Sequence, residues 1–308
     1  MFFRIYKKIM IYTSVFTFLQ ITSTPKVSII TSVYKGGYFI EEFMRDITNQ
    51  TMFDQCELII INANSPDNEE EVILRYMKKY PNIFYLRLGS DPGLYPVWNM
   101  AIKLSNAQYI MNANVDDRLK EDAMEVFVKA LDENPEIDLV YSDIFITSVP
   151  NSPYDGCKAW AVSNFNAFSQ KAMMVCMPMN HPMWRKTLHD KYGLFSEEYK
   201  AAGDYEMWLR AVDQGAHFLK INSIYGVWYY NPQGLSNNLV VHRKEVSEIL
   251  KKYCHLFDLS YMSPSELYEK FLLESSNALV IVSQDLLKQA YNHKKAITEK
   301  VPLYYVGK

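Results

Sequence analysis

The stretch that decides the fold reads Tyr109-Ile110-Met111-Asn112-Ala113-Asn114-Val115-Asp116-Asp117-Arg118. Its first three residues are apolar and predict a short buried strand, and the polar residues after them predict a turn. In an open α/β sheet, ligands bind at the carboxyl ends of the strands. Carboxylate and amide oxygens there suit Mg²⁺ or Mn²⁺, which commonly share their coordination with substrate phosphates. The alternative is a solvated turn in which an Asp caps the next helix.

Strand-like and helix-like segments alternate on both sides of this stretch. Apolar β-branched runs predict strands at residues 27–34, 56–61, 83–88, 108–111 and 137–147, and helical spacing predicts helices at 38–49, 69–80, 95–105 and 121–134. This alternation predicts an α/β fold with a mostly parallel sheet flanked by helices. The loops after the strands then lie along one edge of the sheet, and the polar candidate residues fall on that edge.

The pattern changes after residue 147. Residues 150–182 are irregular and predict loops that shape a cleft, 201–210 lead into a helix, 217–221 and 224–230 predict strands, and 244–255 and 264–292 predict helices. We therefore expect an N-terminal extension at 1–25, a main α/β domain at 26–240 and a helical C-terminal region at 241–308. That last region could cover the sheet, form a homodimer or rest against a membrane.

Composition excludes several classes of protein. The chain has 308 residues and a formal net charge of −3, with no long basic block, which argues against a nucleic-acid partner. Its four cysteines are widely scattered, without the close spacing of a zinc site. Since no disulfide framework is indicated, a reducing compartment is favoured and we expect a cytoplasmic protein.

The N-terminal extension leaves three interpretations open. Residues 2–8 mix aromatic side chains with Arg4, Lys7 and Lys8, and residues 9–21 are largely apolar. The apolar run is too short to span a membrane comfortably, and it lacks an obvious cleavage site for a signal peptide. An interfacial anchor that associates with the membrane surface, a signal segment and an extension packed on the domain all fit.

Six segments occur in an order that is typical of one enzyme family. They are 27–34 (VSIITSVY), 48–51 (TNQT), 58–65 (LIIINANS), 91–95 (DPGLY) with Trp98-Asn99, 112–118 (NANVDDR) and 203–210 (GDYEMWLR). Together they resemble family 2 glycosyltransferases, GT-A fold enzymes that use nucleotide-diphosphate sugars. The resemblance covers about Lys26 to Asn237. It implies inverting, metal-assisted transfer of a hexosyl group, with Mn²⁺ or Mg²⁺ as cofactor, to a hydroxyl of a glycan, lipid or protein.

The resemblance assigns the chemistry to two carboxylates. Asp116 stands at the second acidic position of the family's Asp-x-Asp motif and is the expected metal ligand, with Asn114 at the first position. Asp204 matches the Asp of the family's Glu-Asp pair and is the expected catalytic base, while Gly203 replaces the Glu. The alternative for each Asp is a helix N-cap, because a helix N-terminus also favours a carboxylate.

The remaining candidates would hold the donor or the acceptor. The expected nucleotide-sugar-binding residues are Thr31, Val33, Tyr34, Asn62, Asn64, Asp91, Gly93, Asn99 and Asn114. His181, Trp184 and Trp208 are candidates for contact with the acceptor or diphosphate, although Trp is more commonly a packing residue. Because Asn62 and Asn114 stand where the family usually carries carboxylates, the alternative function is a non-catalytic sugar- or partner-binding protein on the same fold.

Overall fold

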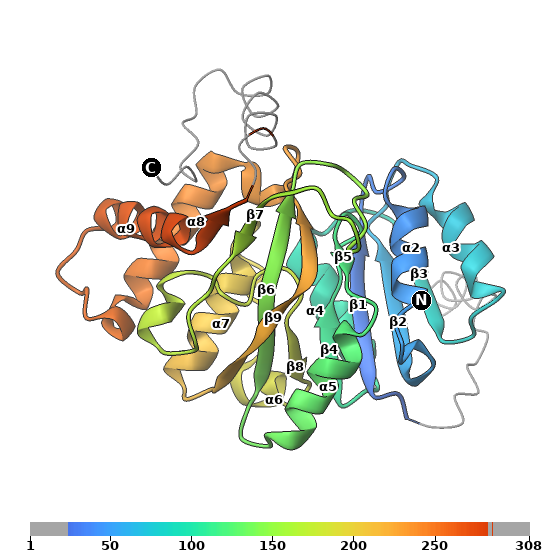
Figure 1. The fold of residues 1–308 in the computed structure, drawn as a ribbon, viewed down its shortest axis with the longest axis horizontal. Helices are drawn as coiled ribbons and strands as arrows, with labels where there is room; N and C mark the ends of the chain where they lie inside the picture. Colours follow the sequence, from blue (N-terminus) through green and yellow to red (C-terminus); the bar gives the residue numbers. More distant parts are fainter. Residues whose placement is uncertain (1–23, 283–284, 286–308) are drawn as a thin grey trace, which may run out of the picture.

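The computed structural model describes residues 24–282 and residue 285, and its centre is a ten-stranded sheet flanked by helices (Figure 1). The strands are β1 (Val27–Val33), β2 (Cys56–Asn62), β3 (Ile83–Arg87), β4 (Tyr109–Asn112), β5 (Arg118–Leu119), β6 (Leu139–Thr147), β7 (Ala159–Ser163), β8 (Met183–Arg185), β9 (Phe218–Tyr229) and β10 (Leu279–Ile281). Along the sheet they run β10-β7-β6-β8-β4-β1-β2-β3, with β9 paired to β6 and β5.

Most residue pairs in the sheet are parallel, as the sequence predicts. β1 pairs in parallel with β2 and β4, β2 with β3, and β6 with β9. The strands β5, β7, β8 and β10 add antiparallel pairs. β1 and β2 are buried almost throughout, which explains their continuous apolar, β-branched sequences.

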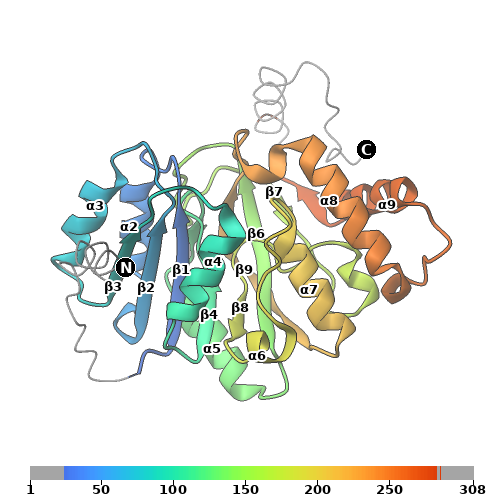
Figure 2. The same ribbon diagram turned by 180° about the vertical axis from the view of Figure 1, so that it is seen from behind.

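Helices cover both faces of the sheet (Figures 1 and 2). They are α2 (Ile40–Thr48), α3 (Glu69–Met77), α4 (Leu94–Leu104), α5 (Ala123–Glu133), α6 (Leu188–Tyr192), α7 (Gly203–Asp213), α8 (Leu239–Lys252) and α9 (Pro264–Asn277). Successive residues of a strand point to opposite faces, so Ile29 packs with α2, α3 and α5 while Ile30 packs with α4 and α7. The two faces thus form two separate cores.

Several elements differ from the sequence prediction. The strands expected at 217–221 and 224–230 form one strand, β9, whose register against β6 is irregular near Asp143. The helix expected at 264–292 ends at Asn277, and Leu279–Ile281 forms β10, which pairs with β7. Residues 283, 284 and 286–292 of that expected helix lie outside the described residues. Within the expected loop region 150–182, residues Ala159–Ser163 form β7.

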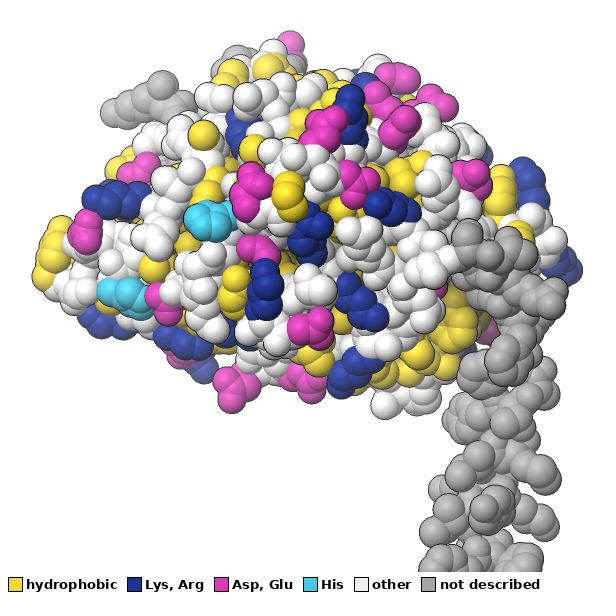
Figure 3. Space-filling model, turned by 90° about the horizontal axis from the view of Figure 1, so that it is seen from below, with side chains coloured by type: hydrophobic (Ala, Val, Ile, Leu, Met, Phe, Trp, Pro, Cys, Tyr) yellow, Lys and Arg dark blue, Asp and Glu magenta, His cyan; other side chains and the backbone are white. Residues whose placement is uncertain are grey.

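The surface agrees with the small net charge of the chain. On the face seen in Figure 3, cationic and acidic side chains are interspersed and no field of one sign dominates. In the part of the chain that the structure describes, no helix is long and apolar enough to cross a membrane. The predicted N-terminal extension lies outside the described residues, apart from its last two positions.

Candidate active site

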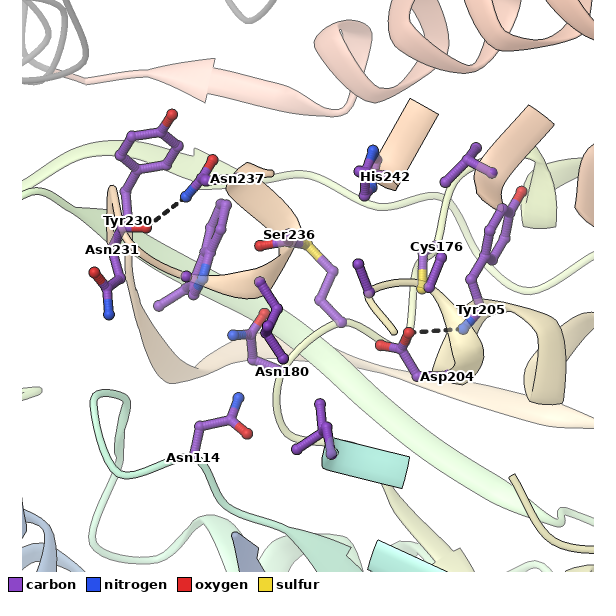
Figure 4. Close-up of a pocket in the computed structure, with 18 of the residues that line it drawn as sticks. Asn114, Cys176, Asn180, Asp204, Tyr205, Tyr230, Asn231, Ser236, Asn237 and His242 are labelled. Atoms are coloured by element: carbon purple, nitrogen blue, oxygen red, sulfur yellow. Dashed lines mark hydrogen bonds between the residues drawn. The ribbon is translucent and has the colours of Figure 1, made fainter. Parts of the chain in front are cut away.

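A cavity of about 920 Å³ opens at the carboxyl ends of β1 and β4. Four of the predicted site residues line it: Tyr34, Asn114, Asp116 and Asp204. Figure 4 shows Asp204, Cys176 and Tyr205 on one side of the cavity and Asn231 and Asn237 on another. The cavity therefore brings together residues that lie far apart in the sequence.

The turn between β4 and β5 carries the expected metal ligand. Asp117 N–H donates to the carbonyl of Asn114 at 3.2 Å, which closes a turn with Asp116 at its tip. Burial and the neighbouring Asp117 carboxylate raise the pKa of Asp116, and a hydrogen bond of 3.0 Å from Asn231 Nδ2 opposes this. Since α5 begins at Ala123 with Asp122 as its N-cap, Asp116 does not cap a helix.

Hydrogen bonds to the Asp117 carboxylate hold this turn in place. Its carboxylate accepts hydrogen bonds from Asn114 Nδ2 at 2.9 Å, Asn180 Nδ2 at 2.8 Å and the backbone N–H of Tyr229 at 3.0 Å. The side chain is buried, so these bonds replace the water that the carboxylate loses. Asp117 thus ties the turn to the end of β9 and positions Asn114.

Asp204 is the second residue of α7 and lies at the edge of the cavity. Its Oδ1 accepts hydrogen bonds from Tyr205 N–H at 2.9 Å and from the Tyr95 hydroxyl at 3.2 Å. Burial raises the pKa of Asp204 above its usual range, and these two donors oppose the rise. The N-cap of α7 is Ala202, so Asp204 sits inside the helix and is not its cap.

Gly203 explains how Tyr95 reaches Asp204. A Cβ at position 203 would lie 2.7–2.9 Å from three carbons of the Tyr95 ring, closer than real contacts allow. The glycine therefore lets the ring lie against the start of α7 with its hydroxyl beside the carboxylate. This is the physical consequence of having Gly203 where the family commonly has Glu.

The start of α7 is fixed by α8. Glu245 is buried and accepts hydrogen bonds from the backbone N–H groups of Lys200, Ala201 and Ala202 at 2.8–3.0 Å. A second link joins Glu206 of α7 to Lys252 Nζ at 3.0 Å. The C-terminal region therefore sets the position of Asp204.

The β1 and β2 candidates have different environments. Tyr34 is 46% exposed and lines the cavity, whereas Thr31 and Val33 are fully buried within β1. Asn62 is also buried, and its Oδ1 accepts a hydrogen bond of 2.7 Å from Ser65 N–H. Asn64 is exposed with a φ of 58°, which is typical of a turn residue. Among these residues, only Tyr34 faces the cavity.

The candidates before and within α4 shape a loop. Asp91 Oδ1 accepts a hydrogen bond of 2.8 Å from the N–H of Gly93, whose φ of 95° favours glycine. Asn99 is buried and braces Phe195: its Nδ2 donates to the Phe195 carbonyl at 2.9 Å, and its Oδ1 accepts from Phe195 N–H at 3.0 Å. None of the three lines the cavity.

The acceptor candidates His181, Trp184 and Trp208 do not line the cavity either. Both tryptophans are buried in the core and their rings pack edge to face at 5.4 Å, so stacking on a sugar is excluded in this arrangement. His181 is buried with Nε2 3.9 Å from Asp117 Oδ2. Burial and the nearby Arg118 charge lower the pKa of His181 to about 3, so the ring is neutral.

The sequence did not single out Tyr95, Asn180 and Asn231 as site residues. Tyr95 ends the segment 91–95 that contributes to the family resemblance, and Asn180 directly precedes the candidate His181. Asn231 follows β9, and its contact with Asp116 joins positions with no common motif. Residue spacing carries no signal for such long-range contacts between side chains.

The donor set can accept a divalent ion, although it is small. No group of three or more His, Cys, Asp or Glu that could hold a metal occurs within residues 24–282 or at 285. Asp116 and Asn114 supply a carboxylate and an amide oxygen at one turn of the cavity wall. Mg²⁺ sites often use one or two carboxylates together with substrate phosphates, so these residues fit such an ion.

Comparison with known proteins agrees with this geometry. The sequence profile described as glycosyl transferase family 2 matches residues 28–187, which is just over half of the chain. The chain belongs to glycosyl transferase family 2. This family 2 member is 30% identical to the hyaluronan synthase of Pasteurella multocida over 209 residues, which are 67% of the chain and 20% of that relative. Over three curated relatives, the chain spans 13–20% of their length.

Solved structures show the same GT-A fold. Residues 1–349 of Staphylococcus aureus TarS, in complex with UDP-GlcNAc, match with a TM-score of 0.62 at 15% identity, over 81% of this chain and 72% of that fragment. The mannosyltransferase PcManGT from Pyrobaculum calidifontis, in complex with GDP-Man and Mn²⁺, matches with a TM-score of 0.56 at 14% identity, over 90% and 82%. At this identity the likeness concerns the fold.

Proposed function

We propose that this family 2 member transfers a hexosyl group from a nucleotide-diphosphate sugar to an acceptor hydroxyl, with inversion and with Asp204 as the base. One observation carries the proposal: Asp116 and Asp204, from distant segments, line one cavity at the carboxyl edge of the sheet. The TarS and PcManGT structures, which hold UDP-GlcNAc and GDP-Man, support a hexosyl donor.

In the proposed reaction, the oxygen of the acceptor hydroxyl attacks the anomeric carbon of the donor sugar. Asp204 accepts the proton that this hydroxyl loses. The new C–O bond forms while the bond from that carbon to the diphosphate breaks, and the diphosphate leaves with the bonding electrons. Attack on the face opposite the leaving group inverts the configuration. A raised pKa brings Asp204 nearer to neutral pH, where a general base is most effective.

The leaving group develops negative charge beside Asp116 and Asn114. A divalent ion bound by these two residues would neutralise the departing diphosphate. Asn231 and Asp117 hold the two metal-site residues in position through the hydrogen bonds described above. Replacement of a carboxylate by Asn114 leaves one negative charge fewer at this site, so we expect metal affinity to depend strongly on the bound donor.

A thermal-shift panel of UDP-, GDP-, CMP- and dTDP-linked sugars, each with and without Mn²⁺, tests this function. A ligand at 100 times its Kd stabilises the folded state by about 2.7 kcal/mol. We expect one nucleotide sugar to raise the melting temperature in a metal-dependent way, and we expect Asp116→Ala to abolish this rise. Asp54→Ala is the control and should keep the rise, because Asp54 is an exposed carboxylate that precedes β2. No shift with any donor would remove the basis for the proposal.

The second candidate is a binding protein without catalysis, favoured by the neutral residues Asn62 and Asn114. Release of nucleoside diphosphate from the donor found in the panel separates the two. Turnover that is abolished in Asp204→Asn, with donor binding intact, supports the enzyme. Binding without turnover toward any acceptor or water supports the binding protein.

A further inference from the structure

The cavity has two chemically different halves. The half at the strand ends is polar and contains Asn114, Asp116 and Asn180. Most of the lining that comes from β6 and the segments after it is apolar or aromatic, with polar side chains such as His242, Ser247 and Ser275 among it. Its apolar residues include Ile146, Trp160, Phe165, Trp228, Leu239, Val246, Phe271, Leu272 and Leu279. A volume of about 920 Å³ lies near the upper end of ligand sites, so both halves can be filled at once.

The apolar half is built largely by the C-terminal part of the chain. α8 contributes Leu239 and Val246, α9 contributes Phe271 and Leu272, and β10 contributes Leu279. All five follow residue 187, where the match to the family ends. Most of this half is therefore formed by a part of the chain to which the match does not extend, while Ile146, Trp160 and Phe165 come from the matched region.

The apolar wall continues to the surface. Val240 is 84% exposed and Leu235 is 54% exposed, and both line the cavity. Protein interiors are normally close-packed, and a continuous apolar surface that reaches solvent usually marks a binding site. The apolar half is thus a groove that runs from the neighbourhood of Asp204 to an open rim.

The charged side chains that line the cavity limit the class of ligand that can bind there. The acidic side chains that line the whole cavity within the described residues are Asp116 and Asp204. Arg243 and Lys244 line it from α8 and are exposed, and they pair with Glu269 and Glu248. Because each of these cations already has an acidic partner, a neutral apolar chain fits this rim without leaving a charge unpaired.

We propose that the acceptor is lipid-linked: a sugar or alcohol whose hydroxyl lies at Asp204 and whose apolar chain lies in the groove toward Val240 and Leu235. This inference rests on the proposed function, since Asp204 fixes where the hydroxyl must be. It names the acceptor class, and it places the specificity for that class in α8, α9 and β10.

The test compares n-octyl β-D-glucoside with methyl β-D-glucoside, titrated below the micelle concentration and followed by tryptophan fluorescence. Trp160 and Trp228 line the groove and supply the signal. Each buried methylene strengthens binding by about fourfold. If about four methylenes of the octyl chain are buried in the groove, octyl glucoside should bind on the order of 100-fold more tightly than methyl glucoside. Equal affinity for the two glucosides would overturn the proposal.

Exposed rim residues give variants that leave the core intact. We expect Val240→Ser combined with Leu235→Ser to weaken octyl glucoside binding about tenfold and to leave methyl glucoside unchanged. Leu273→Ser is the matched control, because Leu273 is 59% exposed on α9 and does not line the cavity. If the rim variant binds octyl glucoside as tightly as the control variant does, the octyl chain of the ligand does not lie at this rim and the inference fails.

The donor panel keeps this inference separate from the function on which it rests. A nucleotide-sugar shift without any preference for the octyl chain removes the lipid-linked acceptor and leaves the glycosyltransferase. In that outcome the groove is left to another segment of this chain or to a protein partner. Octyl binding without any donor shift removes the proposed function, and with it the acceptor role of the groove.

Discussion

Removal of the Tyr95 hydroxyl tests the proposed role of Asp204 as the catalytic base. In Tyr95→Phe the ring still fits against Gly203 and still contacts Trp98 and Phe195. What is lost is the hydrogen bond of 3.2 Å to Asp204 Oδ1, which stabilises the ionised carboxylate. The pKa of Asp204, already raised by burial, should therefore rise further.

The size of the effect follows from the bond length. Hydrogen bonds to charged groups contribute about 1.5–3 kcal/mol, and a separation beyond the usual range for O–H···O places this one near 1.5 kcal/mol. Since one pKa unit corresponds to about 1.4 kcal/mol, the pKa of Asp204 should rise by about one unit. The base acts in its deprotonated form, so the rate should fall about tenfold on the acid limb and recover at high pH.

The assay is kcat/KM against pH, from about pH 5 to about pH 9, by release of the nucleoside diphosphate. Tyr141→Phe is the control, because its hydroxyl donates to the Asn166 carbonyl at 3.1 Å and does not touch Asp204. An acid limb that stays where it is in Tyr95→Phe would refute the assigned role of this bond. A uniform drop across the pH range would instead indicate that Tyr95 acts on the substrate.

Three further predictions concern the scaffold of the site. Gly203→Ala places a Cβ within 2.9 Å of the Tyr95 ring and should cost about 1–3 kcal/mol in urea unfolding, whereas Gly89→Ala, with nothing within 4 Å, should be nearly neutral. Glu245→Ala leaves the buried N–H of Ala202 without its acceptor, so it should lower the free energy of unfolding by about 1–3 kcal/mol and should also lower kcat. Glu248→Ala, at an exposed position on the same helix, is the control for both measurements. Asp117→Asn turns an amide N–H toward Asn114 or Asn180 and should raise the Mn²⁺ concentration needed for half-maximal donor binding, measured by titration; an unchanged value would contradict the positioning role.

The parallel part of the fold was predictable because its signals are local. β1 and β2 are seven-residue buried strands, and α2 buries Ile40, Phe43, Met44 and Ile47 at helical spacing. The short antiparallel strands were not predictable: Met183–Arg185 and Leu279–Ile281 are three residues each, and they exist because β6 and β7 offer partners. Pairing across the sheet decides such segments, and composition does not.

The candidate site divides in the same way. Asp116 and Asp204 could be predicted as candidates because each stands in a recognisable segment, and both line the cavity. Trp184 and Trp208 were placed near the ligand by residue type, yet tertiary packing buries them. Tyr95, Asn180 and Asn231 act through contacts between distant residues, which a single sequence does not encode in any spacing.

The candidate site needs more of the chain than the matched region 28–187. The end of β9 donates the Tyr229 N–H to Asp117 and leads into Asn231, the partner of Asp116. α7 brings Asp204, and Glu245 of α8 holds the start of α7. The turn from Asn114 to Asp117 in the first half of the chain is therefore held in shape by the second half. Because the same C-terminal helices also form the apolar groove, a change in α8 should alter the position of the base and the choice of acceptor together.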